Sequence, residues 1–345
     1  MTMKKLSRKT EFYILLIIVA LSVIIQARSG KFFTGNNMVD LMRSLISPGL
    51  FAIGMFMIIV SGGIDVSFPA VATLSVYIVT DAMVKIGYTG SVVVPIILAA
   101  LIGIGFGAVN GLFIAKMRLP ALIVTLGTQS VYRGVLQGVL SAEQIDVALP
   151  EGYKAFGDSA LVWSVDPETG MTSFLPMAFL VLVVALIAAF IIMRYTMLGR
   201  GIYAVGGDVN SAMRAGFKVV RIKFFVYCFA GMLAAVTNMV RCSMMKMVHT
   251  TNLFGMEMTV IAAVILGGTS LTGGTGTLTG TMLGTLLLTI VSNSLILLGV
   301  PAYWQDFVTG LLIVAGTALS AIQARRAMQR DDTRPNAKTA KAGAA

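Results

Sequence analysis

Long apolar stretches, separated by short polar segments, follow one another along nearly the whole chain. A helix that crosses a bilayer needs roughly 20 mostly apolar residues, and ten stretches reach or approach that length. The predicted spans are residues 12–27, 45–61, 68–84, 92–115, 121–140, 174–193, 224–240, 258–267, 278–298 and 303–322. The eighth is short, and the fifth is polar enough to fit either a full span or a partly re-entrant segment. The pattern predicts an all-α polytopic membrane protein with about ten transmembrane helices.

Composition excludes most other classes of protein. The 345 residues are 57% hydrophobic and only 12% charged, with a mean hydropathy of +0.88, whereas a soluble domain carries about 25% charged residues. The apolar content excludes disorder, and two cysteines exclude a disulfide-rich secreted scaffold. The net charge of +11 does not indicate nucleic-acid binding, because the basic residues lie in short segments between apolar runs. The partner that this composition predicts is a lipid membrane.

The distribution of basic residues predicts the orientation, since cytoplasmic segments are enriched in Lys and Arg. With the N-terminus inside, the basic residues after the fourth and sixth spans and in the tail also lie inside; Arg241 and Lys246 are exceptions. The basic start has no small-residue cleavage site after it, so the first span is expected to stay uncleaved. We expect a cytoplasmic N-terminus (1–11), a transmembrane domain (12–323) with a periplasmic loop (141–173) and a cytoplasmic loop (194–223), and a cytoplasmic, disordered tail (324–345).

Two glycine-rich segments interrupt the apolar pattern, at residues 61–67 (SGGIDVS) and 266–276 (LGGTSLTGGTG). Neither is a phosphate-binding P-loop, because no Gly-Lys-Ser/Thr ending follows. Their helix-breaking glycines are predicted to be Gly62, Gly63, Gly267, Gly268, Gly273 and Gly274. The first segment also matches the second at one constant offset, which hints at an internal repeat; the matched pairs are Gly62 with Gly267, Gly63 with Gly268, Val66 with Leu271 and Ser67 with Thr272.

Asp65 in the first segment is an acid at or near membrane depth. Such acids are costly and usually face a substrate path or a partner. Asp65 has two compatible interpretations, as part of a solute path and as the cap of the next helix, with Pro69 in the first helical turn. In the cytoplasmic loop, Asp208 or Asn210 is expected to cap a short helix that Gly216 ends, and such a helix suits docking to a partner.

Residues for catalysis are nearly absent from the sequence. His249 is the only histidine and lies in a polar loop, so we predict no metal site, and the two cysteines show no CxxC spacing. The chain therefore has no visible energy source. It is expected to be a transporter subunit powered by another protein, or a passive or ion-coupled transporter.

Four short motifs occur in order along the chain: 61–67 (SGGIDVS), 119–134 (LPALIVTLGTQSVYRG), 199–207 (GRGIYAVGG) and 266–274 (LGGTSLTGG). Together they resemble the permease subunits of bacterial ABC importers of the ribose/galactose/xylose class, over about residues 10–323. The resemblance implies a fold related to the vitamin B12 and branched-chain amino acid permeases, located in the inner membrane.

The resemblance also implies partners. A second permease, identical or paralogous, would complete the path, two cytoplasmic ATPase subunits would use ATP and Mg, and a periplasmic sugar-binding protein would deliver the cargo. This chain would bind no cofactor and would not be an enzyme. Its cytoplasmic loop would couple to the ATPase through Gly206, Gly207, Asp208, Asn210, Ala212, Arg214 and Gly216.

The sequence departs from the family in two places. Phe68 and Pro69 stand where the family usually has Val-Gly, a variant more similar to permeases for the furanosyl autoinducer, and Asp208 replaces a usual Asn. A permease supplied by a binding protein needs only a weakly polar path. Met244, Met245 and Met247 would suit such a path, and the alternative is that they only fill lipid-facing or core gaps. The candidate polar residues of the path are Asp65, Thr125, Gln129 and Asn293.

Three rival functions stay open. An ion-coupled transporter would need a relay of membrane acids, and the candidates are Asp65, Asp81, Glu257 and Asp306. A lipid-modifying enzyme would need a nucleophile or metal cluster that the sequence lacks. The same importer class with an amino acid or nucleoside as cargo is the strongest rival, because permease motifs discriminate cargo poorly.

Overall fold

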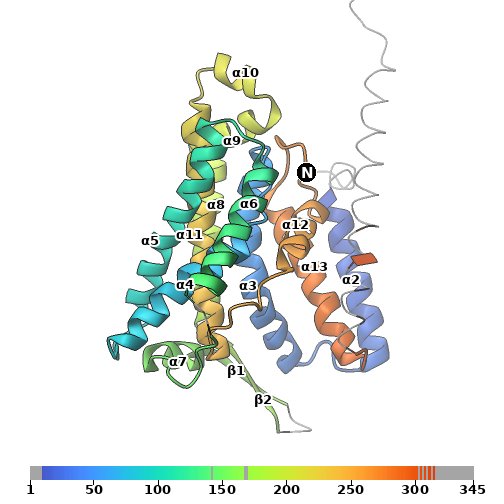
Figure 1. Ribbon diagram of the computed structural model, residues 1–345. Coiled ribbons are helices and arrows are strands. Elements are labelled where there is room, and N and C mark those ends of the chain that lie inside the picture. The colour runs from blue at the N-terminus through green and yellow to red at the C-terminus, as the bar shows by residue number, and fades with distance from the viewer. Residues whose placement is uncertain are drawn as a thin grey trace, which may run out of the picture.

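The computed structural model describes residues 10–140, 143–166 and 170–301, together with the single positions Trp304, Phe307, Gly310, Leu311 and Val314. Within these residues the chain forms a bundle of long helices (Figure 1). The helices of the first half are α2 (Thr10–Ser29), α3 (Gly35–Val60), α4 (Phe68–Lys85), α5 (Val93–Gly111) with the π-helical turn η1 (Leu112–Lys116), and α6 (Ala121–Gly134) with η2 (Val135–Val139).

The second half contains a small extramembrane unit and four further long or membrane-embedded helices. In chain order the elements are α7 (Glu151–Asp158), β1 (Ala160–Val165), β2 (Thr172–Pro176), α8 (Ala178–Tyr195), α9 (Met197–Gly207), α10 (Val209–Arg214), α11 (Val219–Met245), α12 (Met256–Leu266) and α13 (Leu278–Leu297). The elements α7, β1 and β2 lie at one end of the bundle and α10 lies at the other (Figure 1). We call these the hairpin end and the α10 end.

Seven of the ten predicted spans are helices long and apolar enough to cross a membrane: α2, α3, α4, α5 with η1, α8, α11 and α13. The eighth predicted span is α12, whose 11 residues extend about 16 Å, half of a bilayer core. The fifth is α6 with η2, which is helical throughout but is not among the seven. The tenth span, the N-terminal segment and the tail lie almost wholly outside the described residues.

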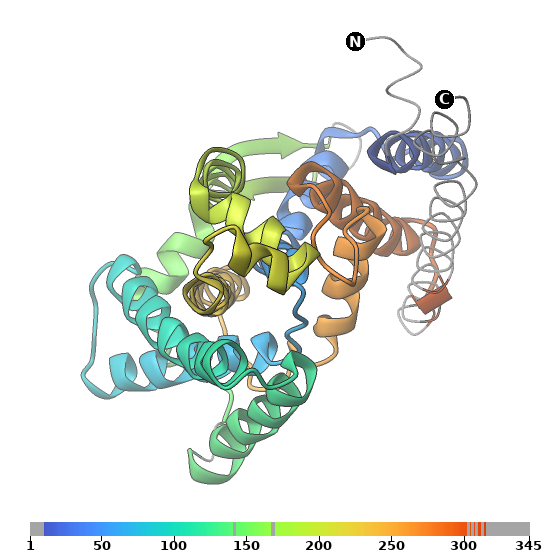
Figure 2. The ribbon, with the colours of Figure 1, turned by 90° about the horizontal axis from the view of Figure 1, so that it is seen from above.

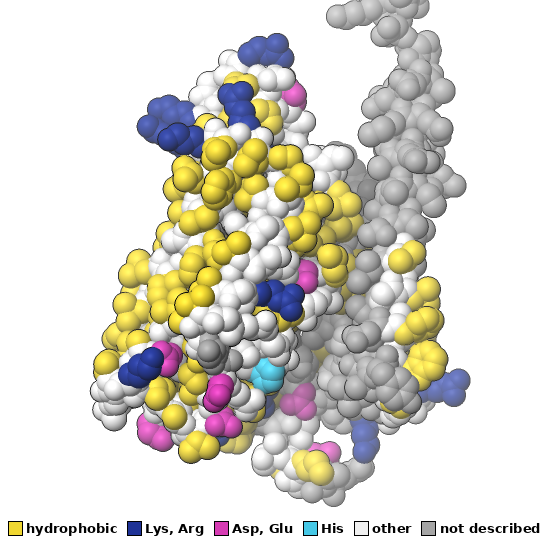
Figure 3. Space-filling model, in the orientation of Figure 1, with side chains coloured by type: hydrophobic (Ala, Val, Ile, Leu, Met, Phe, Trp, Pro, Cys, Tyr) yellow, Lys and Arg dark blue, Asp and Glu magenta, His cyan; other side chains and the backbone are white. Residues whose placement is uncertain are grey.

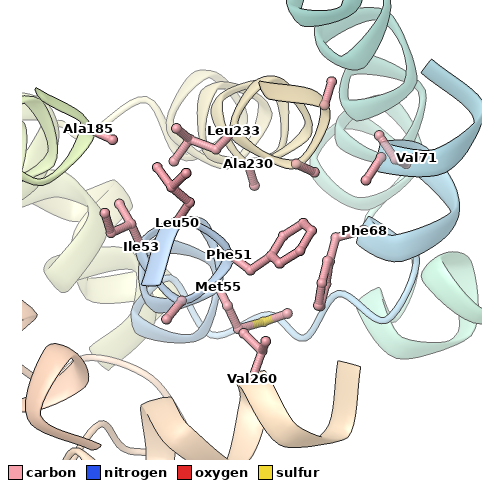
Figure 4. Close-up of a cluster of buried hydrophobic side chains, with 14 of the residues drawn as sticks. Leu50, Phe51, Ile53, Met55, Phe68, Val71, Ala185, Ala230, Leu233 and Val260 are labelled. Carbon is pink, nitrogen blue, oxygen red and sulfur yellow. The ribbon is translucent and has the colours of Figure 1, made fainter. Parts of the chain in front are cut away.

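Helix α3 is the centre of the bundle, because nearly every side chain from Ile46 to Val60 is buried. It packs against α8, α11, α12 and α13, while α5 packs closely along α11. Seen from the α10 end, α5 and α6 lie on one side of the bundle and α2 and α13 on the opposite side (Figure 2). Between α3, α4 and α11, Phe51 and Phe68 face each other with ring centroids 4.8 Å apart (Figure 4).

The surface of the bundle is that of a membrane protein. Large apolar side chains such as Leu16, Ile97 and Val184 are exposed around its sides, where lipid tails replace water. On the visible face, Lys and Arg side chains gather around α10, whereas the Asp and Glu side chains lie mostly toward the hairpin end (Figure 3).

The hairpin end is built by the segment predicted as a large extramembrane loop. Strands β1 and β2 pair antiparallel, with Trp163 opposite Phe174. The Arg43 guanidinium lies over the Phe174 ring, 5.0 Å from its centroid, and so attaches the hairpin to the first turns of α3.

Candidate functional site

The break between α3 and α4 holds Asp65, whose side chain is only 4% exposed. Asp65 Oδ1 accepts hydrogen bonds from the Ser67 backbone N–H (2.7 Å) and hydroxyl (2.6 Å). Asn110 of α5 donates to the same hydroxyl oxygen at 2.8 Å. The carboxylate therefore holds Ser67, the N-cap residue of α4, in place, although no side chain caps the helix directly. Of the two interpretations of Asp65, the cap takes this indirect form, and a part in a solute path stays a prediction.

Thr125 of α6 docks on the same break. Its hydroxyl donates to the Ile64 carbonyl oxygen and accepts from the Val66 backbone N–H, both at 3.3 Å. The side chain is fully buried. Thr125 and Asp65, far apart in the sequence, therefore hold one non-helical segment between them.

Gln129 and Asn293 do not join this network. Gln129 is half-buried one turn further along α6. Asn293 lies on α13, where its side-chain amide donates to Asn37 Oδ1 at 3.1 Å. The four predicted path residues therefore fall into one cluster, Asp65 with Thr125, and two separate positions. Met245, one of the methionines considered for the path, is exposed at the last residue of α11.

The two glycine-rich segments meet the end of α9 at one point. Gly274 N–H donates to the Val60 carbonyl oxygen at 2.9 Å, and Gly206 packs on that same oxygen so closely that a Cβ would overlap it. A Cβ on Gly273 would lie 2.8 Å from Gly62 Cα. We call Val60, Gly62, Gly206, Gly273 and Gly274 the glycine junction.

The segments after α3 and after α12 share one geometry, but not at the offset that the sequence indicated. Gly62 (φ +80°) and Gly268 (φ +88°) each follow a helix and donate to the carbonyl three residues earlier, as in a Schellman cap. The structural equivalent of Gly62 is therefore Gly268, not Gly267. The predicted match was wrong by one residue. The two Gly-Gly pairs align in the sequence, but α3 ends two residues before its pair and α12 ends one residue before its pair. Gly267 instead packs against Gly280 of α13.

Helices α9 and α10 form the loop predicted to face a partner. Asp208 caps α10 by accepting from the Ser211 N–H at 2.7 Å. Hydrogen bonding to the Ser211 side chain, and then to its backbone N–H, lowers the pKa of the Asp208 carboxyl group. Gly216, at φ +86°, ends the turn after α10. Gly206 and Ala212 face the interior of the chain, so only part of the predicted coupling set is available to a partner. The exposed members are Gly207, Asp208, Asn210, Arg214 and Gly216.

A cavity of about 290 Å³ lies between α3, α11, α12 and α13. We call it the polar cavity after its hydroxyl, amide and guanidinium side chains, although more of its wall is apolar than polar. Asn293, Thr259 and Arg241 line it together with Ser44 and Pro48 of α3. Sequence reasoning treated Arg241 only as an exception to the charge rule. It also missed Asn110, although a polar side chain within an apolar span was a signal for it. Among the described residues there is no cluster of His, Cys, Asp or Glu able to hold a metal.

The described residues thus form a multi-pass helical bundle in which the exposed helix α10 is joined through α9 and Gly206 to two helix breaks. Residues 37–316 match the family described as the branched-chain amino acid transport system / permease component. The chain belongs to this family of ABC-importer permeases, as its motifs predicted.

Individual relatives agree with the family match. The chain is 31% identical to the ribose import permease protein RbsC of Escherichia coli (strain K12), over 87% of this chain and 90% of that protein. It is 33% identical to the RbsC of Bacillus subtilis (strain 168), over 92% of each. It is also 33% identical to the autoinducer 2 import system permease protein LsrC of Klebsiella pneumoniae, over 95% and 91%. No solved structure matches the chain.

Proposed function

We propose that this chain is the permease of an ATP-driven importer that moves a monosaccharide or a similar small polar solute, the furanosyl autoinducer included, into the cytoplasm. The observation that carries the proposal is the attachment of the exposed helix α10, through α9, to the two helix breaks. Helix α10, which carries the exposed residues Asn210 and Arg214, lies at the tip of the bundle (Figure 1), and α9 links it through Gly206 to the ends of both broken helices. A force on α10 is thereby delivered to the breaks.

The partners follow from this assignment. Two ATPase subunits, which bind the ATP and Mg, dock at α10; a second permease, identical or paralogous, completes the path; and a periplasmic binding protein delivers the solute. Names of relatives that import ribose and autoinducer 2 support the cargo class.

The α10 end is assigned to the cytoplasm. Arg200, Arg214, Lys218 and Arg221 are exposed there, as the positive-inside rule requires. Thr277 also donates a 2.8 Å hydrogen bond to Glu11, so that α2 begins at the same end and the N-terminus is assigned to the cytoplasm with it. The C-terminal tail is assigned there from the sequence alone.

The path itself is proposed to involve Asn293, Gln129, Asp65 and Thr125 in different ways. Asn293 lines the polar cavity, whereas Asp65 and Thr125 hold the break in shape. An ion-coupled mechanism receives less support, because Asp81 pairs with Lys85 at 2.7 Å and Glu257 accepts from the Gly255 N–H. Neither is free to act as a proton relay in this state, and the candidate Asp306 lies outside the described residues.

A cross-linking experiment tests docking at α10. In a background of Cys228→Ala and Cys242→Ala, Asn210→Cys should cross-link to the ATPase subunit in native membranes, and Asn252→Cys, exposed at the opposite end, should not. Uptake of labelled D-ribose should stop on ATP depletion and survive an uncoupler. Cross-linking from Asn252 alone would reverse the orientation, and uptake of L-leucine in place of D-ribose would shift the cargo to an amino acid.

A further inference from the structure

The polar cavity near the hairpin end holds an arginine without a counter-ion. Arg241 lies one turn before the end of α11 and is partly buried. Among the described residues no carboxylate forms an ion pair with it, and none lines the cavity. A guanidinium within a membrane-spanning helix is costly unless water or a ligand satisfies it. Arg241 therefore offers the cavity guanidinium N–H donors that no carboxylate among the described residues engages.

The other polar groups of the wall add both donors and acceptors. The hydroxyls of Ser44, Thr259 and Ser292 form no side-chain hydrogen bond within the described part of the chain. Asn293 uses its amide N–H on Asn37, which leaves its Oδ1 as an acceptor. Pro48 has no backbone N–H, so the Ser44 carbonyl oxygen lacks its helical partner. Both Pro48 and Ser44 line the cavity.

Apolar side chains complete the wall. Val260, Ala263 and Leu288 lie among the polar residues, and the volume of about 290 Å³ is near the lower end of small-molecule sites, which begin at about 300 Å³. A ligand that matches this wall carries several hydroxyl groups, each able to donate and accept, and a compact ring with C–H faces. A zwitterionic amino acid could pair its carboxylate with Arg241, but its ammonium group would find no carboxylate among the lining residues.

We propose that this cavity is a binding subsite for a neutral polyhydroxylated solute, with Arg241 as the residue that selects for oxygen-rich ligands. The inference rests on the proposed function, since it places the cargo in the half of the bundle that would face the periplasm. Arg241 donates to the solute's hydroxyl oxygens, and Asn293 Oδ1 and the Ser44 carbonyl oxygen accept from its hydroxyl groups. This role would explain why a basic residue, Arg241, lies on the side of the membrane where the charge rule expects few.

Protection from chemical labelling tests the site directly. In the background of Cys228→Ala and Cys242→Ala, Thr259→Cys in whole-importer membranes is treated with a charged, membrane-impermeant thiosulfonate. Millimolar D-ribose should slow its labelling at least threefold, and L-leucine should not. The control is Asn252→Cys, which is exposed outside the cavity and should label at one rate throughout. Equal rates with and without D-ribose at Thr259→Cys, or protection by L-leucine alone, would overturn the proposal.

Transport provides the second measurement. Arg241→Gln should raise the KM for D-ribose uptake about tenfold, the effect of about 1.4 kcal/mol of binding energy, and Arg241→Lys should raise it less, because it keeps the charge but not the fork of donors. Arg43→Gln is the matched control. It removes the same charge from the residue next to Ser44, but the Arg43 guanidinium lies over the Phe174 ring and does not line the cavity. An unchanged KM in Arg241→Gln would contradict the assignment.

The two proposals fail in distinguishable ways. If the wild type imports D-ribose but Thr259→Cys shows no protection and Arg241→Gln has a normal KM, the importer assignment stands and the subsite is wrong. If the wild type imports neither D-ribose nor autoinducer, the proposed cargo is wrong. The labelling assay, with D-ribose as the polyol probe, then still decides whether the cavity binds such a solute.

Discussion

Gly274 donates its backbone N–H to the carbonyl oxygen of Val60 at 2.9 Å, which joins the segment after α12 to the end of α3. The carbonyl groups at a helix end have no partner within the helix, and here a residue from the other end of the chain supplies one. Gly206 of α9 lies against the same oxygen. Three segments that are distant in the sequence therefore meet on one atom, and α9 cannot shift along its axis without disturbing both breaks.

The glycine junction makes a prediction about Gly206. In Gly206→Ala, the new Cβ would overlap the Val60 carbonyl oxygen and lie 2.6 Å from the Gly274 nitrogen. Backbone atoms cannot move aside as the tip of a side chain can, so we expect a loss of about 1–3 kcal/mol of unfolding free energy. Thermal unfolding of the purified permease in detergent, followed by near-UV circular dichroism, measures it.

Gly207→Ala is the matched control for Gly206→Ala. Gly207 is the next residue of α9, it is exposed, and a Cβ there would meet nothing within 4 Å. Its unfolding temperature should stay equal to that of the wild type or rise slightly, because Ala favours a helix over Gly. Equal destabilisation by both substitutions would show that the junction does not depend on the close approach at Gly206.

The contact of Asp65 with Ser67 can be separated experimentally from a role in transport. Asp65→Ala removes the acceptor of the Ser67 N–H and hydroxyl, so it should cost about 1 kcal/mol of stability and reduce uptake without preventing membrane insertion. Asp65→Asn keeps an acceptor oxygen and should retain stability. Uptake rates measured beside the amount of protein in the membrane distinguish the two effects.

The outcome of Asp65→Asn decides between the interpretations. If uptake falls while stability is retained, the negative charge takes part in transport. If uptake and stability both stay at the wild-type level, Asp65 acts only by holding Ser67. Wild-type uptake in Asp65→Ala would remove the role in transport, whatever the change in stability.

The hydrophobic pattern predicted the long helices well and their ends less well. Helix α3 begins at Gly35, ten residues before the predicted span at residue 45, because its first turns carry polar side chains that hydropathy counts as loop. Asn37 is nonetheless buried, and its amide N–H donates to the Phe32 carbonyl oxygen at 2.7 Å. Composition alone cannot distinguish a buried polar side chain that has a hydrogen-bond partner within the fold from a polar side chain exposed to water.

The candidate site was only partly predictable for a related reason. Both helix-breaking segments were found, because glycine pairs in an apolar context are a local signal. Their meeting with Gly206 is a tertiary contact with no local signal, and Gly206 was expected to face an ATPase instead of Val60. The cap at Asp208 was predictable, since it depends on residues three apart.

Phe68 tests the core that surrounds the break. Its ring packs on Phe51, and both are nearly fully buried. Phe68→Ala should lower the unfolding free energy by about 3–5 kcal/mol, as for other large core truncations. Phe33→Ala is the control, because the Phe33 side chain is 60% exposed and should cost much less. Thermal denaturation in detergent compares the two, and similar losses would place Phe68 outside the stabilising core.

Asp208 predicts a pH dependence that is confined to α10. Its hydrogen bond with Ser211 lowers the pKa of the carboxyl group in the folded state, so the cap is fully formed above the pKa of an unfolded Asp. The cap is lost as the pH falls through the lowered folded value.

Hydrogen exchange at the Ser211 amide, corrected for the intrinsic dependence on pH, should therefore speed up at acid pH in the wild type. In Asp208→Ala exchange should be fast at every pH, whereas Asp208→Asn should stay protected without a pH dependence. Protection of the Ser211 amide in Asp208→Ala would show that α10 is held by its packing through Ala212 and not by the cap.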